Sequence, residues 1–478
     1  MSEPRYTAPE MFIAGEWIAR TPVMVPIENP ATGQVIGELP QADEDMIDAA
    51  LASSAEGFEI WRKTAPAERA RIMAEAARIL RANLDQAIID LTMDQGKPVG
   101  EARSELANCA ILLEYMPEEA ARVQDRLLPA RPGFRDLRVR YEPIGPVIAL
   151  SPWNFPASLA GRKLASALAV GCSVIIRPAG ETPSGITHVV RALDQAGLPK
   201  GVVNLVHGEP SLVTARLIDS PITRKVAFTG STRVGSELAA RAGKNAKPSV
   251  MELGGHAPVI ICADADLDLA VRLSVFSKYR NAGQVCVSPT RWYVHDDLYD
   301  AFVTRFGDAA RALKVGNGLE PDTIMGPMAN GRGLATVDRL VADALVKGAR
   351  LVTGGRRIQR EGHFYEPTVL ADVPDTANIM TEEPFGPVAV INRFSTLDEA
   401  LARANSTPYA LGAYAFTTSE ETAEEIARSF DAGMIGINTF TITHMDSPIG
   451  GRRYSGFGSE GGPEGIAAYL MPKFTAMA

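Results

Sequence analysis

The chain has 478 residues, of which 46% are hydrophobic and 22% charged, and this ordinary globular composition predicts about two to four structural units. Its net charge of −9 argues against nucleic acid as the main partner, because phosphate binding needs a basic face. Neither a signal peptide nor an apolar run of the roughly 20 residues needed to span a bilayer is visible, so a cytoplasmic protein with no membrane partner is expected.

Short strands followed by helices are predicted for the N-terminal quarter of the chain. Residues 1–40 are broken by turn residues such as ENPATGQ, and apolar side chains then recur at helical spacing from Asp43 to about Asn83. Pro66 is expected to open the second of these helices, because proline is favoured at the first helical position. The arginine-rich residues 121–141 are typical of an extended arm rather than of a core element.

Alternating strands and helices are predicted from residue 143 to residue 254. The apolar segments VIAL, SVIIRP, VVNLVHG, KVAFTG and SVMELG are separated by helical stretches. Strands joined in this way need right-handed crossovers and form a mostly parallel sheet with two covered faces. A second α/β set follows from residue 256 to about residue 445, and the tail ends in AAYLMPKFTAMA, which can pair as an exposed strand. The fold class is therefore α/β with a Rossmann-like sheet.

Three segments lie just after predicted strands, where α/β sheets bind their ligands: SPWNFP, RPAGETP and FTGSTRVG. The last places Gly230 and Gly235 at a strand-to-helix turn, where backbone N–H groups can approach a phosphate. It is not the GxGxxG pattern, and an ordinary tight turn has the same composition.

Cys286 and Glu252 are the candidate reactive side chains. Cys286 lies in the glycine-containing stretch NAGQVCV, where a thiolate can attack a carbonyl, and Glu252 ends the strand in MELGGH, where a carboxylate can activate water. The alternatives are an inert buried cysteine and a structural ion pair. The other cysteines, Cys109, Cys172 and Cys262, show no paired or metal-ligand spacing, and six scattered histidines offer none, so free thiols and no metal site are expected.

Taken together, PWNFP, FTGSTRVG, MELGG, NAGQVC and EEPFGPV resemble the signature segments of the aldehyde dehydrogenase superfamily, in that family's order and approximate spacing. GEW with NPATG near the N-terminus and SPIGGRRYSGFG near the C-terminus match as well, so the resemblance covers nearly the whole chain. It implies an enzyme that oxidises an aldehyde to a carboxylic acid with NAD(P)+.

The resemblance assigns roles to four catalytic residues. Cys286 would form a thiohemiacetal with the aldehyde and then a thioester. The side-chain amide of Asn154 and the backbone N–H of Cys286 would hold the oxyanion. Glu252 would activate the water that hydrolyses the thioester, and Lys163 matches a family lysine that can relay protons.

The resemblance also implies the cofactor contacts. Glu383 and Phe385 would hold the nicotinamide ribose and ring, and the rest of the cofactor would touch Trp153, Asn154, Arg177, Gly180, Gly230, Ser231, Gly235 and Leu253. Many members have lysine and then glutamate three residues later, where this chain has Arg177 and Gly180. Because that glutamate repels a 2′-phosphate and Glu181 stands beside the vacancy, the choice between NAD+ and NADP+ stays open.

Within the family the chain is similar to succinate-semialdehyde dehydrogenases. These enzymes grip a substrate carboxylate with two arginines and a hydroxyl group, and Arg162, Arg280 and Thr443 stand at the matching positions. The alternative is that both arginines form structural ion pairs on helix faces.

Three further positions depart from the pattern of these relatives. Ser288 replaces a second cysteine, so a redox disulfide is not expected. The loop TFTITHMD, with Phe440, His444 and Met445, is bulky and favours a longer or aromatic aldehyde. His256 stands where lysine is common and is interpreted as a surface variation.

The expected organisation is a cofactor domain over residues 1–120 and 142–254, a catalytic domain over residues 255–447, and an oligomerisation arm of residues 121–141 with 448–478. In the family such an arm adds strands across a dimer, so a homodimer or homotetramer is expected. Two other functions remain open: an acylating enzyme that passes the thioester to coenzyme A, and a catalytically silent binding protein. Glu252 disfavours the first, and the four catalytic residues retained together disfavour the second.

Overall fold

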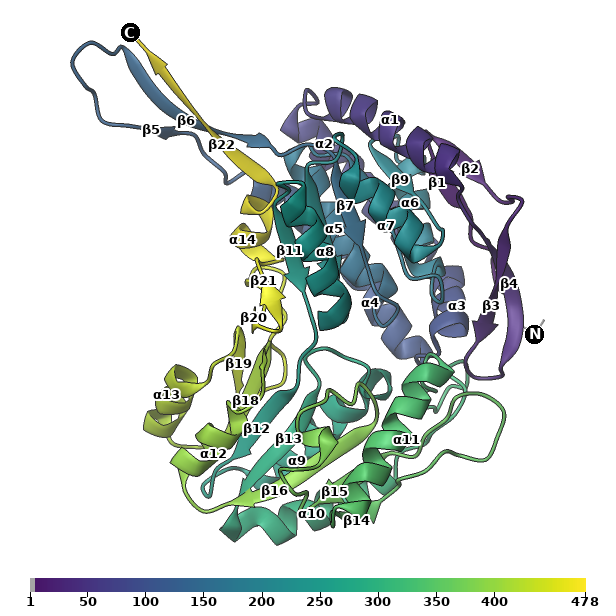
Figure 1. The fold of residues 1–478 in the computed structure, drawn as a ribbon, viewed down its shortest axis with the longest axis vertical. Helices are drawn as coiled ribbons and strands as arrows, with labels where there is room; N and C mark the ends of the chain where they lie inside the picture. The colour runs from purple at the N-terminus through teal and green to yellow at the C-terminus, as the bar shows by residue number, and fades with distance from the viewer. Residues whose placement is uncertain (1–4) are drawn as a thin grey trace.

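The computed structural model describes residues 5–478 and shows two α/β units and a protruding β arm (Figure 1). Each unit is built on one large sheet, and the two sheets lie on either side of a seam that crosses the middle of the molecule. The expected α/β fold with a Rossmann-like sheet, a second α/β unit and a small β arm is confirmed.

The sheet of the first unit has eight strands. In spatial order they are β2 (Glu16–Ile18), β1 (Met11–Ile13), β9 (Val203–Leu205), β8 (Val174–Arg177), β7 (Val147–Leu150), β10 (Lys225–Thr229), β11 (Ser249–Glu252) and β21 (Gly456–Phe457). The five from β9 to β11 run parallel, as the five apolar segments predicted. Chain order reverses between β7 and β10, and this reversal opens a crevice at the carboxyl ends of the two strands.

Helices cover both faces of this sheet. They are α1 (Glu44–Trp61), α2 (Pro66–Ala82), α3 (Leu84–Gln95), α4 (Val99–Ala120), α5 (Pro156–Val170), α6 (Ser184–Gln195), α7 (Pro210–Asp219) and α8 (Thr232–Lys244). One core lies between the sheet and α2, α4, α5 and α6, and a second lies under α1, α7 and α8. Helix α2 begins at Pro66, as predicted. A separate hairpin joins β3 (Met24–Asn29) to β4 (Gln34–Pro40).

The second unit holds a seven-stranded sheet. Its order is β14 (Arg350–Thr353), β15 (Thr368–Ala371), β16 (Val388–Phe394), β13 (Pro289–His295), β12 (Ala257–Ile261), β18 (Gly412–Phe416) and β19 (Met434–Ile437), all parallel to their neighbours except β14. Its helices are α9 (Leu267–Tyr279), α10 (Asp296–Arg311), α11 (Gly331–Val346), α12 (Leu397–Ala404) and α13 (Glu420–Ser429), with single 3₁₀ turns η1 (Arg280–Gly283) and η2 (Asn378–Met380). No helix of residues 5–478 is both long and apolar enough to cross a membrane.

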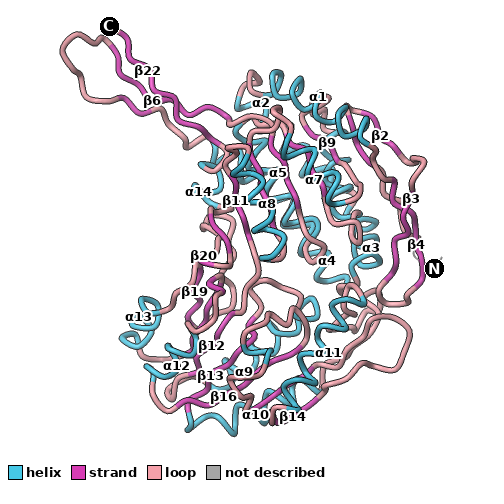
Figure 2. The backbone as a smooth tube through the Cα atoms, in the orientation of Figure 1, coloured by secondary structure: helices cyan, strands magenta, loops and turns pink. Residues whose placement is uncertain are grey.

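The C-terminal tail connects all three parts of the molecule. Strand β20 (Arg452–Arg453) pairs with β17 (Tyr409–Ala410), β21 joins the edge of the first sheet, and α14 (Gly462–Ala467) packs on α4 and α5. Only the last strand, β22 (Leu470–Met477), leaves the body and pairs with β6 (Asp136–Pro143), which β5 (Arg126–Leu127) borders (Figure 2). The arm therefore consists of residues around β5, β6 and β22, while residues 448–469 pack against the first unit.

Candidate active site

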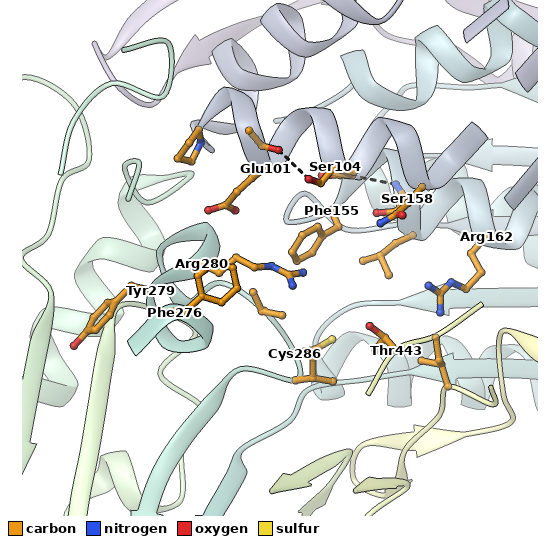
Figure 3. A pocket seen from close by; sticks show the side chains of 18 of the residues that line it. Glu101, Ser104, Phe155, Ser158, Arg162, Phe276, Tyr279, Arg280, Cys286 and Thr443 are labelled. Atoms are coloured by element: carbon orange, nitrogen blue, oxygen red, sulfur yellow. Dashed lines mark hydrogen bonds between the residues drawn. The ribbon is translucent and has the colours of Figure 1, made fainter. Parts of the chain in front are cut away.

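A cavity of about 1000 Å³ lies at the seam between the two units. Glu252, at the end of β11, lines it, and so does Cys286, in the turn before β13. Arg162, Arg280 and Thr443 line it as well (Figure 3). Sequence positions up to 281 residues apart, from Arg162 to Thr443, thus meet in one place. The structure brings the candidate nucleophile, base and anion-binding residues into a single pocket.

The loop before Cys286 has an unusual backbone. Asn281, Ala282 and Gly283 are three successive residues with positive φ, at 49°, 52° and 74°. For alanine this conformation costs on the order of 1 kcal/mol or more, and such strain is usually stored at functional sites. A Cβ on Gly283 would lie 2.1 Å from the carbonyl oxygen of Gly386, so this residue must be glycine for the loop to pass.

The surroundings of Cys286 favour its neutral thiol over the thiolate. Burial first, and then the carboxylates of Glu383 and Glu252, raise its pKa to about 12, while the backbone N–H groups of Val287 and Cys286 oppose the rise. A thiol in this environment reacts only when its proton is taken or when a positive charge is brought near it. The Cys286 thiol therefore needs to be activated before it can attack a carbonyl.

Asn154 lies against the cysteine loop at the end of β7. Its side-chain Nδ2 donates to the carbonyl oxygen of Gln284 at 3.0 Å, and its side-chain oxygen has no partner in the described chain. Its own carbonyl accepts from Lys97 Nζ and from Asn281 Nδ2, each at 2.9 Å. The Asn154 side-chain amide is thus held against Gln284, two residues before Cys286 in the chain. A preorganised hydrogen-bond donor at this place can stabilise an oxyanion.

Glu252 belongs to a buried group of charges that includes a residue missed in the sequence, Glu460. Lys163 Nζ lies 2.6 Å from a Glu460 carboxylate oxygen and 2.5 Å from Thr229 Oγ1. Burial raises the pKa of Glu252, Glu460 raises it further, and Lys163 and Arg162 lower it. Glu460 follows SGFGS in the tail, and the pairing of β21 with β11 and the backbone bridge between Ile449 and Glu460 bring it to the site.

Trp153 and Phe385 meet at the seam on the crevice side. Their rings pack edge to face with centroids 5.4 Å apart, and Phe385 has a positive φ of 41°, which is rare for an aromatic residue. Glu383 accepts from the Gly255 N–H at 3.2 Å, and a Cβ on Gly254 would lie 2.7 Å from a Glu383 oxygen. The residues expected at the nicotinamide end thus lie beside the strand that carries Glu252.

The turn after β10 has the geometry of a phosphate site. Ser231 caps α8, and its side chain accepts from the Val234 N–H at 3.4 Å. A Cβ on Gly235 would lie 2.2 Å from a Leu253 methyl group, so the helix can approach β11 only with glycine there. A Cβ on Gly230 would collide with the Phe228 ring. The free N–H groups at the start of α8 can receive an anion at the crevice.

A second cavity of about 460 Å³ holds the residues expected at the adenosine end, Arg177 and Gly180. The Arg177 guanidinium donates to the Gly208 carbonyl oxygen at 3.2 Å, and its Nε has no partner in the described chain. Glu181, beside Gly180, forms an ion pair with Arg332 at the start of α11. The carboxylate beside Gly180, whose effect on the choice of cofactor was left open, is therefore paired with a cation of the second unit.

The two arginines of the expected anion site reach the cavity from different helices. Arg162 lies on α5, and Arg280 follows α9 and stacks on the Phe155 ring, 5.2 Å from its centroid (Figure 3). Across residues 5–478 neither guanidinium has an ion-pair or hydrogen-bond partner, so neither forms the structural ion pair considered as the alternative. Thr443 stands at the cavity wall on the loop before the tail.

Two sequence interpretations need correction. His256 is not a surface residue: it is 2% exposed, its ring nitrogens pair with Thr290 Oγ1 at 2.8 Å and the Ile379 carbonyl oxygen at 2.9 Å, and burial lowers its pKa. A neutral imidazole with two partners can replace a lysine in the core, which a sequence pattern does not reveal. Phe440 packs on Tyr414 with centroids 4.6 Å apart and does not line the cavity, whereas His444 and Met445 do.

Comparison with known proteins agrees with this geometry. The chain matches the Aldehyde dehydrogenase family over residues 17–475. It is 43% identical to 4-(hydroxymethyl)benzenesulfonate dehydrogenase of Comamonas testosteroni over 475 residues, 99% of both chains. It is 37% identical to the succinate-semialdehyde dehydrogenase [NADP(+)] of Escherichia coli over 466 residues, 97% of both. A solved succinate-semialdehyde dehydrogenase from Burkholderia pseudomallei superposes with a TM-score of 0.97 at 38% identity, covering 100% of this chain and 99% of the other. The chain belongs to the aldehyde dehydrogenase family and is an NAD(P)+-dependent aldehyde dehydrogenase.

Proposed function

We propose that the enzyme oxidises aldehydes that carry an anionic group, a carboxylate or a sulfonate, at the end away from the carbonyl. The observation that carries this proposal is the pair of guanidiniums of Arg162 and Arg280, which line the cavity of Cys286 and form no ion pair with a carboxylate of residues 5–478. Their N–H donors are therefore available to a ligand, and an arginine fork binds a carboxylate or a sulfonate with directional, charge-assisted bonds. Thr443 adds a hydroxyl group at the same wall.

The chemistry follows from the side chains around the sulfur. The Cys286 sulfur, once deprotonated, adds to the carbonyl carbon, and the Asn154 amide and the Cys286 N–H stabilise the oxyanion that forms. Loss of hydride from that carbon leaves a thioester on Cys286. Glu252 then removes a proton from water, which attacks the thioester and returns the thiolate as the acid leaves. Because Glu252 is buried beside the cavity with a raised pKa, it is a competent base, and we assign a hydrolytic rather than an acylating enzyme.

The cofactor residues fit a dinucleotide. The N–H groups at the start of α8 that Ser231 leaves free, with Gly230 and Gly235, follow β10, and the cavity with Arg177 lies at the end of β8. Bound NAD(P)+ supplies the hydride acceptor and a positively charged ring. Glu383 and Phe385 are the residues we assign to its nicotinamide end.

The test compares anionic aldehydes with neutral ones of the same shape. We expect Arg280→Met and Arg162→Met to lower kcat/KM for succinate semialdehyde and 4-formylbenzenesulfonate by about 10- to 100-fold each, because each variant loses a charged hydrogen bond. For butanal and benzaldehyde the change should stay within about threefold. Equal losses on anionic and neutral substrates would contradict the proposal.

A second candidate is a preference for aromatic over short aliphatic substrates. The cavity of about 1000 Å³ exceeds what a four-carbon chain fills, and Phe155, Met445 and Leu159 offer apolar walls. The relative from Comamonas testosteroni is described by an aromatic sulfonate. Higher kcat/KM for 4-formylbenzenesulfonate than for succinate semialdehyde in the unmodified enzyme would support this choice, and the reverse order would exclude it. Adding coenzyme A to the same assays distinguishes hydrolysis from acyl transfer.

A further inference from the structure

Three charged side chains near the start of α4 point at the active site although no role has been given to them. Glu101 and Glu105 are four residues apart in α4, a spacing that places both on one side of the helix, and Lys97 lies in the turn just before it. Glu101 and Glu105 both line the cavity of Cys286. We call these three residues the α4 clamp.

Lys97 touches the oxyanion loop directly. Its Nζ lies 2.5 Å from a Glu105 carboxylate oxygen and donates to the Asn154 carbonyl oxygen at 2.9 Å. It also lies 4.1 Å from the centroid of the Phe155 ring. Lys97 is 1% exposed and Glu105 is 3% exposed, so water cannot substitute for either partner. The charge of Lys97 is balanced by Glu105, and what the lysine contributes is therefore a fixed position for residues 154 and 155.

Glu105 fixes the helix that follows the oxyanion loop. Its other carboxylate oxygen accepts from the Ala157 N–H at 2.8 Å and from the Ser158 N–H at 3.1 Å. Both N–H groups belong to the first turn of α5, where backbone N–H groups have no hydrogen-bond partner within the helix. The residue before α5 makes no side-chain capping hydrogen bond to them. A carboxylate at this end is also favoured by the helix dipole.

Glu101 fixes the loop of the nucleophile. Its carboxylate accepts from the Asn281 N–H at 2.9 and 3.2 Å, and Asn281 Nδ2 donates to the same Asn154 carbonyl that Lys97 holds, at 2.9 Å. The Asn154 carbonyl oxygen therefore joins the clamp to the strained turn before Cys286. The oxyanion donor Asn154 and the loop of the nucleophile Cys286 are thus both held by side chains at the start of α4.

The second unit holds the clamp in place. The Val99 N–H donates to the Gly318 carbonyl oxygen at 3.0 Å, and a Cβ on Gly318 would lie 2.4 Å from the Lys97 carbonyl oxygen. A side chain at position 318 would push Lys97 away from Asn154. Both units thus determine where the Lys97 ammonium lies.

We propose that Lys97 is a positioning residue for the oxyanion hole, and that it acts through the Asn154 backbone with Glu105 and Glu101 as its supports. The inference rests on the proposed role of Asn154 as an oxyanion donor. It requires that loss of Lys97 weaken the formation and collapse of the thiohemiacetal, while binding of the aldehyde and the cofactor changes little.

The test is a double-mutant cycle read by the pre-steady-state burst of NAD(P)H. Removing one oxyanion donor costs about 10²–10³ in rate, so we expect Asn154→Ala to lose that much and Lys97→Met, which only misplaces the donor, about 10- to 100-fold. The KM for the aldehyde should stay within about threefold. In the Asn154→Ala background, Lys97→Met should cost less than about threefold more, because residues that act as one unit are non-additive.

Two further variants separate positioning from folding. Lys97→Met leaves Glu105 buried without its cation, so K97M/E105Q, which removes both charges and keeps an oxygen for the α5 cap, is measured beside it. The matched control is Lys247→Met, which removes a lysine that donates to the Ile218 and Ser220 carbonyls and to Thr223 Oγ1 far from the cavity, and which should keep the full burst rate.

Additive losses of Lys97→Met and Asn154→Ala, or an unchanged burst rate in both Lys97 variants while Asn154→Ala is slow, would overturn the positioning role alone. An unchanged rate in Asn154→Ala would overturn the oxyanion role of Asn154 and the inference with it. Neither outcome affects the anion-binding proposal, which depends on Arg162 and Arg280.

Discussion

Glu252 is a carboxyl group whose pKa is shifted by its burial and by three charged neighbours. Burial and the Glu460 carboxylate raise its pKa, and the cations of Lys163 and Arg162 lower it. A base must be ionised to accept a proton, so the deacylation rate should rise with pH as Glu252 loses its proton. Arg162 therefore has a second effect beyond substrate binding, because its charge keeps more of Glu252 in the reactive form.

We expect Arg162→Met to move the acid limb of the deacylation rate to higher pH, since the variant removes a cation that lowers the Glu252 pKa. The measurement is the pH profile of kcat with propanal, which has no anionic group and so separates this effect from substrate binding. Arg280→Met is the control and should leave the limb in place, because Arg280 is not among the charges that act on Glu252. If the acid limb stayed at the same pH in Arg162→Met, the charge of Arg162 would not affect the pKa of Glu252 in solution.

Replacing the nucleophile and the base should separate the two halves of the reaction. Cys286→Ala should abolish turnover while the cofactor still binds, as measured by fluorescence titration. Glu252→Gln should keep the NAD(P)H burst and slow the steady state by about 10²–10⁴-fold, the usual contribution of a general base. If the burst disappeared in Glu252→Gln together with turnover, Glu252 would act before hydride transfer and not on the thioester.

At the scale of secondary-structure elements, the loop after β8 and the start of α11 line the cavity that we assign to the adenosine end of the cofactor. Arg177 presents a cation there, and Glu181 is neutralised by Arg332. Position 180 has room for a side chain, because a Cβ there would meet only a Leu39 methyl group at 3.6 Å. Position 180 thus carries no carboxylate that would repel a 2′-phosphate.

We expect the unmodified enzyme to use NADP+, and Gly180→Glu to lower the ratio of kcat/KM for NADP+ over NAD+ by at least about tenfold. The reason is repulsion between the new carboxylate and the 2′-phosphate, which near a protein surface amounts to a few kcal/mol at about 4 Å before solvent screening. Gly180→Gln, of similar size and no charge, is the matched control. A ratio that falls equally in both variants would point to steric blockage instead.

The sequence predicts much of the fold because each of the five parallel strands of the first sheet carries its own signal. The apolar runs of β7 to β11 indicate buried parallel strands, and Pro66 indicates the start of α2. Motif resemblance also indicates which residues gather around Cys286. The sequence does not reveal contacts between residues that no motif links. The contact of Glu460 with Lys163 depends on the path of the C-terminal tail, and that of Lys97 with Asn154 depends on the turn before α4.

At the scale of the whole molecule, the β arm stands away from both units (Figure 1). Strand β22 pairs with β6 on one side only, and large apolar side chains lie exposed on the arm: Leu127, Phe134, Met471 and Phe474. An open strand edge with exposed apolar groups needs a cover. We propose that a second copy of the chain provides it, in a homodimer or homotetramer.

The prediction is that Phe474→Glu, at a side chain 58% exposed, reduces the molar mass measured by light scattering after size exclusion. A charge at a buried intersubunit position is costly, whereas on a free surface it costs almost nothing. Val346→Glu, at an exposed valine outside the arm, is the control and should leave the mass unchanged. A monomeric unmodified protein would refute the proposal at once.

Of the four thiols, only that of Cys286 lines the large cavity, and Ser288 occupies the place two residues further on. A sulfenic acid formed on Cys286 therefore finds no second protein thiol in the cavity with which to form a disulfide. Recovery of the oxidised enzyme must come from a thiol supplied by the solvent, and a sulfur that already carries the acyl group has no free thiolate for an oxidant to attack.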